Sequence, residues 1–184
     1  MFASGSGTNA ENICHYFSHS EKARVELILT NNATAGVIAR AKKLEVPSIV
    51  FNRKDFFESE AILNLLREHK IDLLILAGFL WLVPQNLIHG FEKKIINIHP
   101  ALLPGIGGKG YYGERVHRAV LEGGKIISGI TIHYVNEKFD EGEIIFQAAC
   151  HVSKDDTVDS LSTKIHALEY TYFPVVIEKV MKND

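Results

Sequence analysis

The first two thirds of the chain alternates short apolar runs with stretches of helical periodicity. Strands that alternate with helices form a parallel sheet, because each crossover helix returns the chain to begin the next strand in the same direction. An Asp-x-x-Glu spacing at Asp55 and Glu58 is typical of a helix start. The pattern predicts strands at 1–3, 25–29, 48–51, 73–76 and 95–98, and helices from a glycine turn at 5–9 to about 18, at 34–44 and at 55–69.

The pattern changes in the last third of the chain. After a helix at 115–122 we expect two longer strands, at 127–135 and 143–152, which can pair antiparallel. A final helix at 158–182 contains Pro174, which is expected to kink or interrupt it. The sequence therefore predicts an α/β fold for residues 1–184, a single domain with one doubly wound, mostly parallel sheet and an antiparallel edge near the C-terminus.

Charge and cysteine content exclude several classes of protein. With 20 basic and 22 acidic residues the net charge is −2, so no nucleic-acid partner is expected. Cys14 and Cys150 are too few for a disulfide framework, and the nine histidines show no compact metal-ligand spacing, so we expect no metal. No apolar run approaches the length of a membrane span and the start lacks a signal-peptide pattern, which together predict a cytoplasmic location without membrane contact.

The most chemically suggestive segment is Asn97-Ile98-His99-Pro100 at the end of an apolar run. In an extended chain Asn97 and His99 leave the same face, so an amide donor and a protonatable ring can share one developing oxyanion. Asp140, in a later loop, can fix the tautomer of the ring or hold a water. From spacing alone, the other interpretation is equally strong: Asn97 and His99 close a strand before a proline turn.

Several motifs together resemble one enzyme family. They are Asn-x-His-Pro-Ala-Leu-Leu-Pro at 97–104, Asp-x-Gly at 140–142, Ser-Gly-Ser-Gly-Thr-Asn at 4–9, Leu-Ala-Gly-Phe at 76–79 and Ser-Gly-Ile-Thr-Ile-His at 128–133. In this order the chain resembles the folate-dependent formyltransferases, and among them the branch that formylates glycinamide ribonucleotide in purine biosynthesis. The resemblance implies a Rossmann-like formyltransferase fold, 10-formyltetrahydrofolate as cosubstrate, and catalysis by Asn97, His99 and Asp140.

The glycine turn between the first strand and the first helix is suited to an anion, because backbone N–H groups and a helix N-terminus meet there. It is neither a dinucleotide fingerprint nor a P-loop, so an ordinary tight connection stays an alternative. The resemblance assigns the ribonucleotide phosphate to Gly7, Thr8 and Asn9, and the ribose hydroxyls to Glu169, whose alternative is a place on a solvated helix face.

The resemblance places the folate pocket along Leu80, Trp81, Leu82 and Val83, together with Asn97. Trp81 stands where a better-known branch carries Arg, so a charge contact is lost, while the backbone role of Leu82 does not depend on its side chain. The loop at 105–113 is longer than in that branch and has five glycines, which predicts either a lid or a tolerated surface insertion. His133 matches a family histidine expected to be structural.

By resemblance, the amine of the ribonucleotide attacks the formyl carbon directly, without an enzyme nucleophile. Asn97 and a protonated His99 would stabilise the oxyanion, while Asp140 would raise the pKa of His99 and hold a relay water. The alternatives are a 10-formyltetrahydrofolate hydrolase, a methionyl-tRNA formyltransferase, which would carry a further RNA-binding domain, and a silent nucleotide- or folate-binding module. The sequence leaves open whether the chain forms a homodimer.

Overall fold

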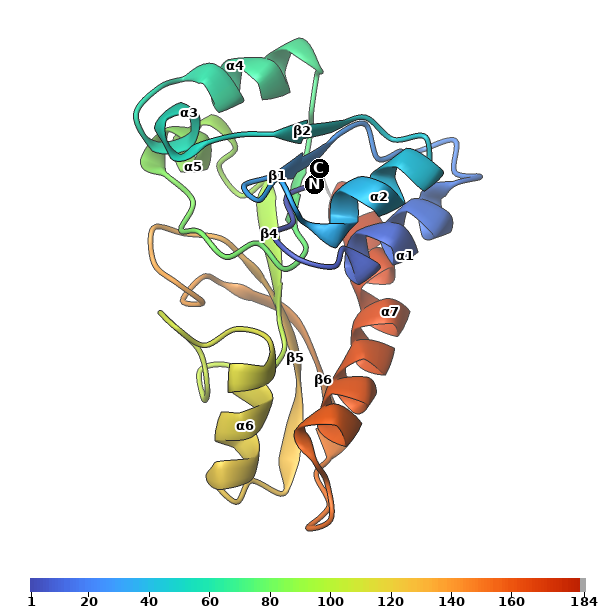
Figure 1. Ribbon diagram of the computed structural model, residues 1–184, viewed down its shortest axis with the longest axis vertical. Helices are drawn as coiled ribbons and strands as arrows, with labels where there is room; N and C mark the ends of the chain where they lie inside the picture. The colour runs from blue at the N-terminus through green and yellow to red at the C-terminus, as the bar shows by residue number, and fades with distance from the viewer. Residues whose placement is uncertain (183–184) are drawn as a thin grey trace. The chain divides into compact units, whose positions relative to one another are not determined.

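The computed structural model describes residues 1–182 as a mixed α/β chain (Figure 1). The chain divides into two compact units, Met1–Ile96 and the part from Asn97 on. The prediction of a single domain stays a prediction. In order along the chain the elements are α1 (Thr8–Phe17), β1 (Ile28–Thr30), α2 (Gly36–Lys43), β2 (Ser48–Val50), α3 (Arg53–Phe57), α4 (Ala61–Glu68), β3 (Leu74–Leu76), α5 (Gln85–Gly90), β4 (Ile95–His99), α6 (Glu114–Glu122), β5 (Ile127–Tyr134), β6 (Ile144–His151) and α7 (Val158–Lys182).

The first unit is built on short parallel strands, as the alternating pattern predicts. β1 pairs with β2 in parallel, and Phe2 forms parallel bridges to both Leu29 and Leu76. The first strand of the sequence prediction is thus reduced to a single bridging residue. Phe2 is almost fully buried and its ring contacts Phe51, Phe56 and Phe79, so one short segment joins the strands to an aromatic core.

The second unit has the antiparallel edge that the sequence predicts. Its strands lie in the order β4-β5-β6, and β5 pairs with β6 antiparallel from Ile127–His151 to His133–Ile144, with an irregularity at Ile132 and His133. The central part of β5 is buried, whereas β6 alternates between exposed and half-buried residues. Helices α6 and α7 pack against each other, and α7 packs against both strands.

Two local predictions are wrong. The helix predicted at 55–69 is two helices, and its N-cap is Asn52, whose side chain accepts the Asp55 N–H at 2.9 Å; Asp55 does not cap it. The strand predicted at 25–29 is shifted toward the C-terminus, to Ile28–Thr30. The helix α7 continues through Pro174 over 25 residues, so Pro174 does not interrupt it, and the alternative of a kink stays a prediction. In addition, the short helix α5 was not predicted.

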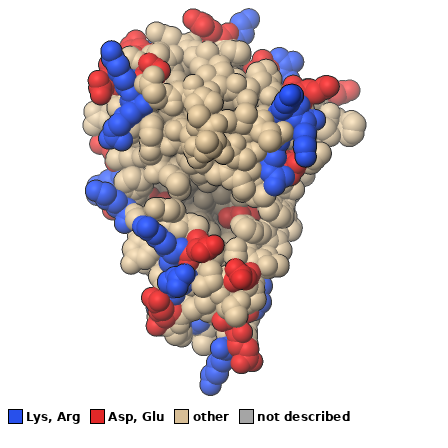
Figure 2. Space-filling model, viewed as in Figure 1, with Lys and Arg blue, Asp and Glu red and all other residues tan. Residues whose placement is uncertain are grey.

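The surface is mixed in charge. On the face drawn in Figure 2, basic and acidic side chains are interspersed and form no continuous cationic area, in keeping with the net charge of −2. Across residues 1–182, no helix combines the length and the apolarity needed to cross a membrane.

Candidate functional site

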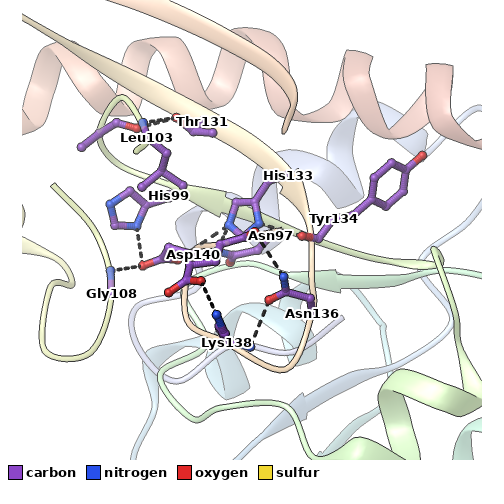
Figure 3. Close-up of polar contacts among 12 residues, drawn as sticks. Asn97, His99, Leu103, Gly108, Thr131, His133, Tyr134, Asn136, Lys138 and Asp140 are labelled. Carbon is purple, nitrogen blue, oxygen red and sulfur yellow. Dashed lines mark hydrogen bonds and ion pairs between the residues drawn. The ribbon is translucent and has the colours of Figure 1, made fainter. Parts of the chain in front are cut away.

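The second unit brings Asn97, His99 and Asp140 together (Figure 3). Asn97 and His99 lie on β4, two residues apart, so their side chains leave the strand on one face. Asp140 comes from the loop between β5 and β6, and one of its carboxylate oxygens lies 3.4 Å from Nδ1 of His99. The predicted grouping of an amide, an imidazole and a carboxylate is therefore present in the structure.

A close backbone approach explains why Asp140 is followed by a glycine two residues later. A Cβ atom at Gly142 would overlap the carbonyl oxygen of Tyr134, so no other residue fits without moving the loop. Asp140 itself has a φ of 56°, a left-handed conformation that aspartate tolerates better than most residues. The Asp-x-Gly spacing is thus a requirement of the bend that delivers the carboxylate.

The loop after β4, predicted to be either a lid or a surface insertion, contacts the same groups. Nε2 of His99 lies 2.7 Å from the carbonyl oxygen of Ile106, and the N–H of Gly108 donates to the carboxylate of Asp140 at 2.9 Å. A Cβ atom at Gly107 would meet Asp140 at 3.3 Å. The glycine content of the loop was the available signal: a Cβ atom at Gly107 would also lie 2.5 Å from Cδ2 of Leu103, so this position requires a glycine.

His133 lies on β5 and contacts two of these three residues, Asn97 and Asp140. Its Nε2 is 3.1 Å from Nδ2 of Asn97 and 3.7 Å from a carboxylate oxygen of Asp140, while its Nδ1 is 2.8 Å from the carbonyl oxygen of Tyr134. Figure 3 shows the ring between these partners. The ring is buried, which fits the structural role expected for it.

Burial has the largest effect on the pKa of His99. Removal from water lowers the pKa of His99, whereas the Asp140 carboxylate and the Ile106 carbonyl raise it and His133 lowers it further. The net pKa lies below the usual value. The effect of Asp140 on the pKa of His99 has the predicted sign, but desolvation is the larger effect, so the net shift of this pKa is downward.

Asp140 stays ionised despite being largely buried. Burial alone would raise the pKa of its carboxyl group, but contacts with His133, His99 and the Gly108 N–H act in the opposite direction and bring the pKa below its usual value. A carboxylate is therefore held next to the His99 ring at neutral pH. It favours the charged form of that ring.

The glycine turn lies in the first unit, between Phe2 and α1. Gly7 caps the helix with a φ of 79°, and a Cβ atom there would lie 2.5 Å from Cγ2 of Val37. Thr8 and Asn9 are the first residues of α1, and their contribution to an anion site stays a prediction. Glu169 belongs to the second unit, where it is buried on α7, so the alternative of a solvated helix face is wrong.

The segment Leu80–Val83 also lies in the first unit. The N–H of Leu80 donates to Oγ of Ser4 at 3.1 Å, which connects this segment to the start of the glycine turn. Leu80 is exposed and Val83 is buried. The Trp81 ring contacts Phe51, Phe56, Phe57 and Phe79, and the guanidinium of Arg53 lies 5.8 Å from its centroid, so Trp81 is part of an aromatic cluster.

Neither a metal nor a cysteine nucleophile is supported by the arrangement. Residues 1–182 contain no group of three histidine, cysteine or acidic side chains placed to hold a metal ion. Both cysteines are free thiols, and burial raises the pKa of Cys14 to about 11, which makes it a poor nucleophile at neutral pH. The absence of a metal from the reaction stays a prediction.

Comparisons with known proteins identify the family to which the chain is similar. Residues 1–177 match the family model described as formyl transferase. The chain is 39% identical to the chloroplastic phosphoribosylglycinamide formyltransferase of Arabidopsis thaliana over 96% of its own length, but it spans only 63% of that protein. It is 36% identical to phosphoribosylglycinamide formyltransferase of Bacillus subtilis, covering 98% of this chain and 93% of the relative. The crystal structure of glycinamide ribonucleotide transformylase 1 from Symbiobacterium toebii superposes with a TM-score of 0.90 at 32% identity, covering 99% of this chain and 86% of that one.

Proposed function

The chain belongs to the formyl transferase family, and from that premise we propose that it transfers a formyl group from 10-formyltetrahydrofolate to the primary amine of glycinamide ribonucleotide. The relatives that it matches over most of both lengths carry the name of this activity. The single observation on which the proposal rests is the meeting of Asn97, His99 and Asp140 at the end of β4. These residues supply an amide donor, a ring donor and a carboxylate.

The proposed chemistry needs no enzyme nucleophile. The amine of the ribonucleotide forms a bond to the formyl carbon, and the formyl oxygen takes up the electron pair of the carbonyl bond. The tetrahedral intermediate then collapses, the bond to the folate nitrogen breaks, and the proton lost by the amine ends on that nitrogen. Holding the two substrates in line accounts for much of the rate, and donors aimed at the oxyanion account for much of the rest.

We assign the oxyanion to Nε2 of His99 and the side-chain amide of Asn97. In the structure the Ile106 carbonyl oxygen accepts a hydrogen bond from Nε2. In the proposed reaction the loop moves away and the formyl oxygen takes the place of this carbonyl oxygen. A full negative charge is a better partner for an imidazolium than a carbonyl dipole is, and it raises the pKa of His99 during the reaction. Asp140 favours the same protonated form from the Nδ1 side and organises the water that relays the proton.

The glycine turn is the proposed phosphate site, with Gly7, Thr8 and Asn9 as its residues and Glu169 assigned to the ribose hydroxyls. In the part of the chain that is described, no acceptor is present for the N–H groups of Ser6, Gly7 and Thr8. Such N–H groups at a helix N-terminus are suited to an anion. The buried carboxylate of Glu169 is suited to accept hydrogen bonds from hydroxyl groups.

The folate site is proposed along Leu80, Trp81, Leu82 and Val83, with Asn97 at the reacting end. The apolar character of the segment suits a flat aromatic ligand, and the main chain of Leu82 supplies polar groups for its edge. The Leu80 N–H is already bonded to Ser4, so we assign no ligand contact to it. Trp81 contributes by packing within the aromatic cluster.

Turnover of 10-formyltetrahydrofolate by the purified chain distinguishes the proposal from its alternatives. The donor is supplied alone and then with glycinamide ribonucleotide, and both released tetrahydrofolate and formylated ribonucleotide are measured. We expect turnover only with the ribonucleotide and equal amounts of the two products. Comparable turnover in water alone would support a hydrolase. Binding of both ligands without turnover would support a silent module.

A further inference from the structure

Every carbonyl oxygen of the glycine turn is held by a donor from the surrounding unit. Two of these donors come from α2, one from α1 and one from the segment after β1. The Ser4 oxygen accepts from Nδ2 of Asn32 (3.4 Å), the Gly5 oxygen from the N–H of Val37 (3.1 Å), the Ser6 oxygen from Nε of Arg40 (2.9 Å) and the Gly7 oxygen from the N–H of Glu11 (2.9 Å).

Fixing the carbonyl groups also fixes the N–H groups, because each peptide unit is planar and its two polar groups point in opposite directions. The peptide that joins Ser6 to Gly7 carries the Ser6 oxygen on one side and the Gly7 N–H on the other. Its orientation is therefore set by the donor that holds the Ser6 oxygen. That donor is the side chain of Arg40.

The Arg40 side chain makes a second contact that fixes its own position. Nη1 pairs with the carboxylate of Glu11 on α1, and both side chains are about one third exposed. The backbone N–H of Glu11 donates to the Gly7 oxygen. Both residues of the ion pair therefore also bond the glycine turn, Arg40 at Ser6 and Glu11 at Gly7. The planar guanidinium can serve the two acceptors at once, which a lysine ammonium cannot reproduce in the same geometry.

Close packing supports this arrangement on the α2 side. A Cβ atom at Gly36 would lie 3.2 Å from the Ser6 oxygen, so the N-terminus of α2 lies directly against the turn. Val37 occupies the space beside Gly7. A peptide that turned over would lose the Arg40 bond and would direct the Ser6 oxygen, in place of the Gly7 N–H, toward the proposed phosphate position.

We propose that Arg40 is a positioning residue of the phosphate site, which with Glu11 fixes the Ser6–Gly7 peptide so that the Gly7 N–H is presented to the phosphate of the ribonucleotide. The inference rests on the proposed function, because it presumes that the turn takes a phosphate. Arg40 acts through orientation: its charge is already paired with Glu11, so a long-range attraction contributes little.

Three substitutions separate orientation from charge. Arg40→Lys keeps the positive charge and removes the planar guanidinium, and Arg40→Gln removes both. Glu11→Gln keeps the shape of the partner side chain and removes its negative charge. Lys42→Gln, at an exposed position on the same helix, is the matched control for loss of a positive charge. For each protein, calorimetry gives the affinity for glycinamide ribonucleotide and for a folate analogue, steady-state kinetics gives kcat and KM, and thermal unfolding gives Tm.

We expect about a tenfold weaker ribonucleotide affinity and a matching rise in KM for Arg40→Lys and Arg40→Gln, the scale of one hydrogen bond to a charged group. The value for Glu11→Gln should lie between these and the parent. In all three, kcat and folate-analogue affinity should equal those of the parent, as should every parameter of Lys42→Gln.

Normal ribonucleotide affinity in Arg40→Lys would overturn the proposal, because charge alone would then suffice. A lower Tm with unchanged affinity, or an equal loss for both ligands, would also overturn it by showing a purely structural role. A parent chain that does not bind the ribonucleotide would refute the phosphate site itself, whereas a parent that binds and variants that bind equally well refute only the role of Arg40.

Discussion

Nε2 of His99 lies 2.7 Å from the carbonyl oxygen of Ile106. The loop that follows the catalytic strand thus already places an oxygen with partial negative charge where the proposed oxyanion forms. Its neighbour Gly108 donates to Asp140 at the same time. One short stretch of backbone therefore contacts both ionisable members of the proposed catalytic set.

Gly107→Ala tests whether the contacts of this loop with His99 and Asp140 affect kcat. Its Cβ atom would lie 2.5 Å from Cδ2 of Leu103 and 3.3 Å from Cβ of Asp140, so the loop or the carboxylate must move. We expect kcat to fall about tenfold, because small displacements of reacting groups are costly, with folate-analogue affinity unchanged. Lys109→Ala, at an exposed position in the same loop, is the control. Equal kcat in the two variants would remove the loop from the catalytic step.

Thr8→Ala and Asn9→Ala test the proposed phosphate site. Loss of a hydrogen bond to a charged ligand should weaken ribonucleotide binding by roughly 1 to 3 kcal/mol, while folate-analogue binding stays at the parental value. Calorimetry with each ligand gives both affinities. Thr163→Ala, at an exposed position on α7, controls for the loss of a threonine hydroxyl. A similar loss for both ligands would identify the turn as structural.

The sequence predicted the α/β class, the antiparallel pair β5 and β6, and the residues that meet at the end of β4, because each depends on a periodic pattern or on a motif of fixed order. It did not predict the contacts of the loop at 105–113, since glycines permit many backbone paths and only the packing of Gly107 and Gly108 against Asp140 selects one. The helix at 55–69 was predicted as continuous because Asp55 and Glu58 imitate a capping box, whereas Asn52 is the residue that caps. The downward shift of the His99 pKa depends on burial, which no local pattern reports.

Substitution of Trp81 tests whether the aromatic cluster stabilises the folded chain. Its ring contacts four phenylalanines, and Arg53 lies 4.6 Å from the centroid of the neighbouring Phe57 ring. Trp81→Ala should lower the free energy of unfolding by roughly 1 to 3 kcal/mol, less than for a fully buried tryptophan because the residue is only half-buried, and Trp81→Phe should lower it less. Chemical denaturation followed by circular dichroism measures this, with Tyr111→Ala, an exposed aromatic in the loop, as control. Unchanged stability in Trp81→Ala would exclude a packing role.

His117 should make the protein less stable in acid. Burial lowers the pKa of His117 from 6.5 to about 4, with His166 and His99 adding to the effect, and Nδ1 has no hydrogen-bond partner among residues 1–182. Above pH 6.5 the ring is neutral in the folded and unfolded chain. As the pH falls toward 4, only the unfolded chain takes up the proton, so stability is lost. Between pH 6.5 and 4, we expect the free energy of unfolding of His117→Leu to fall by roughly 1 to 3 kcal/mol less than that of the parent. Denaturation at a series of pH values measures this difference. Parallel stability curves for the two proteins would contradict this.

Asp140→Asn tests formyl transfer by the Asn97, His99 and Asp140 set most directly. The variant keeps the shape of the side chain and removes the charge that raises the pKa of His99, so this pKa should fall further below its usual value and the alkaline end of the active range should move to lower pH. The neutral amide in the variant also cannot anchor the relay water as the carboxylate does, so kcat should fall about a hundredfold or more, while both substrates still bind. The measurement is transfer of the formyl group to the ribonucleotide in parent and variant across pH, with His99 titrated by NMR in each. A large loss of kcat with a lowered His99 pKa is the predicted result; near-parental kcat, or a His99 pKa that is unchanged or higher, would contradict it.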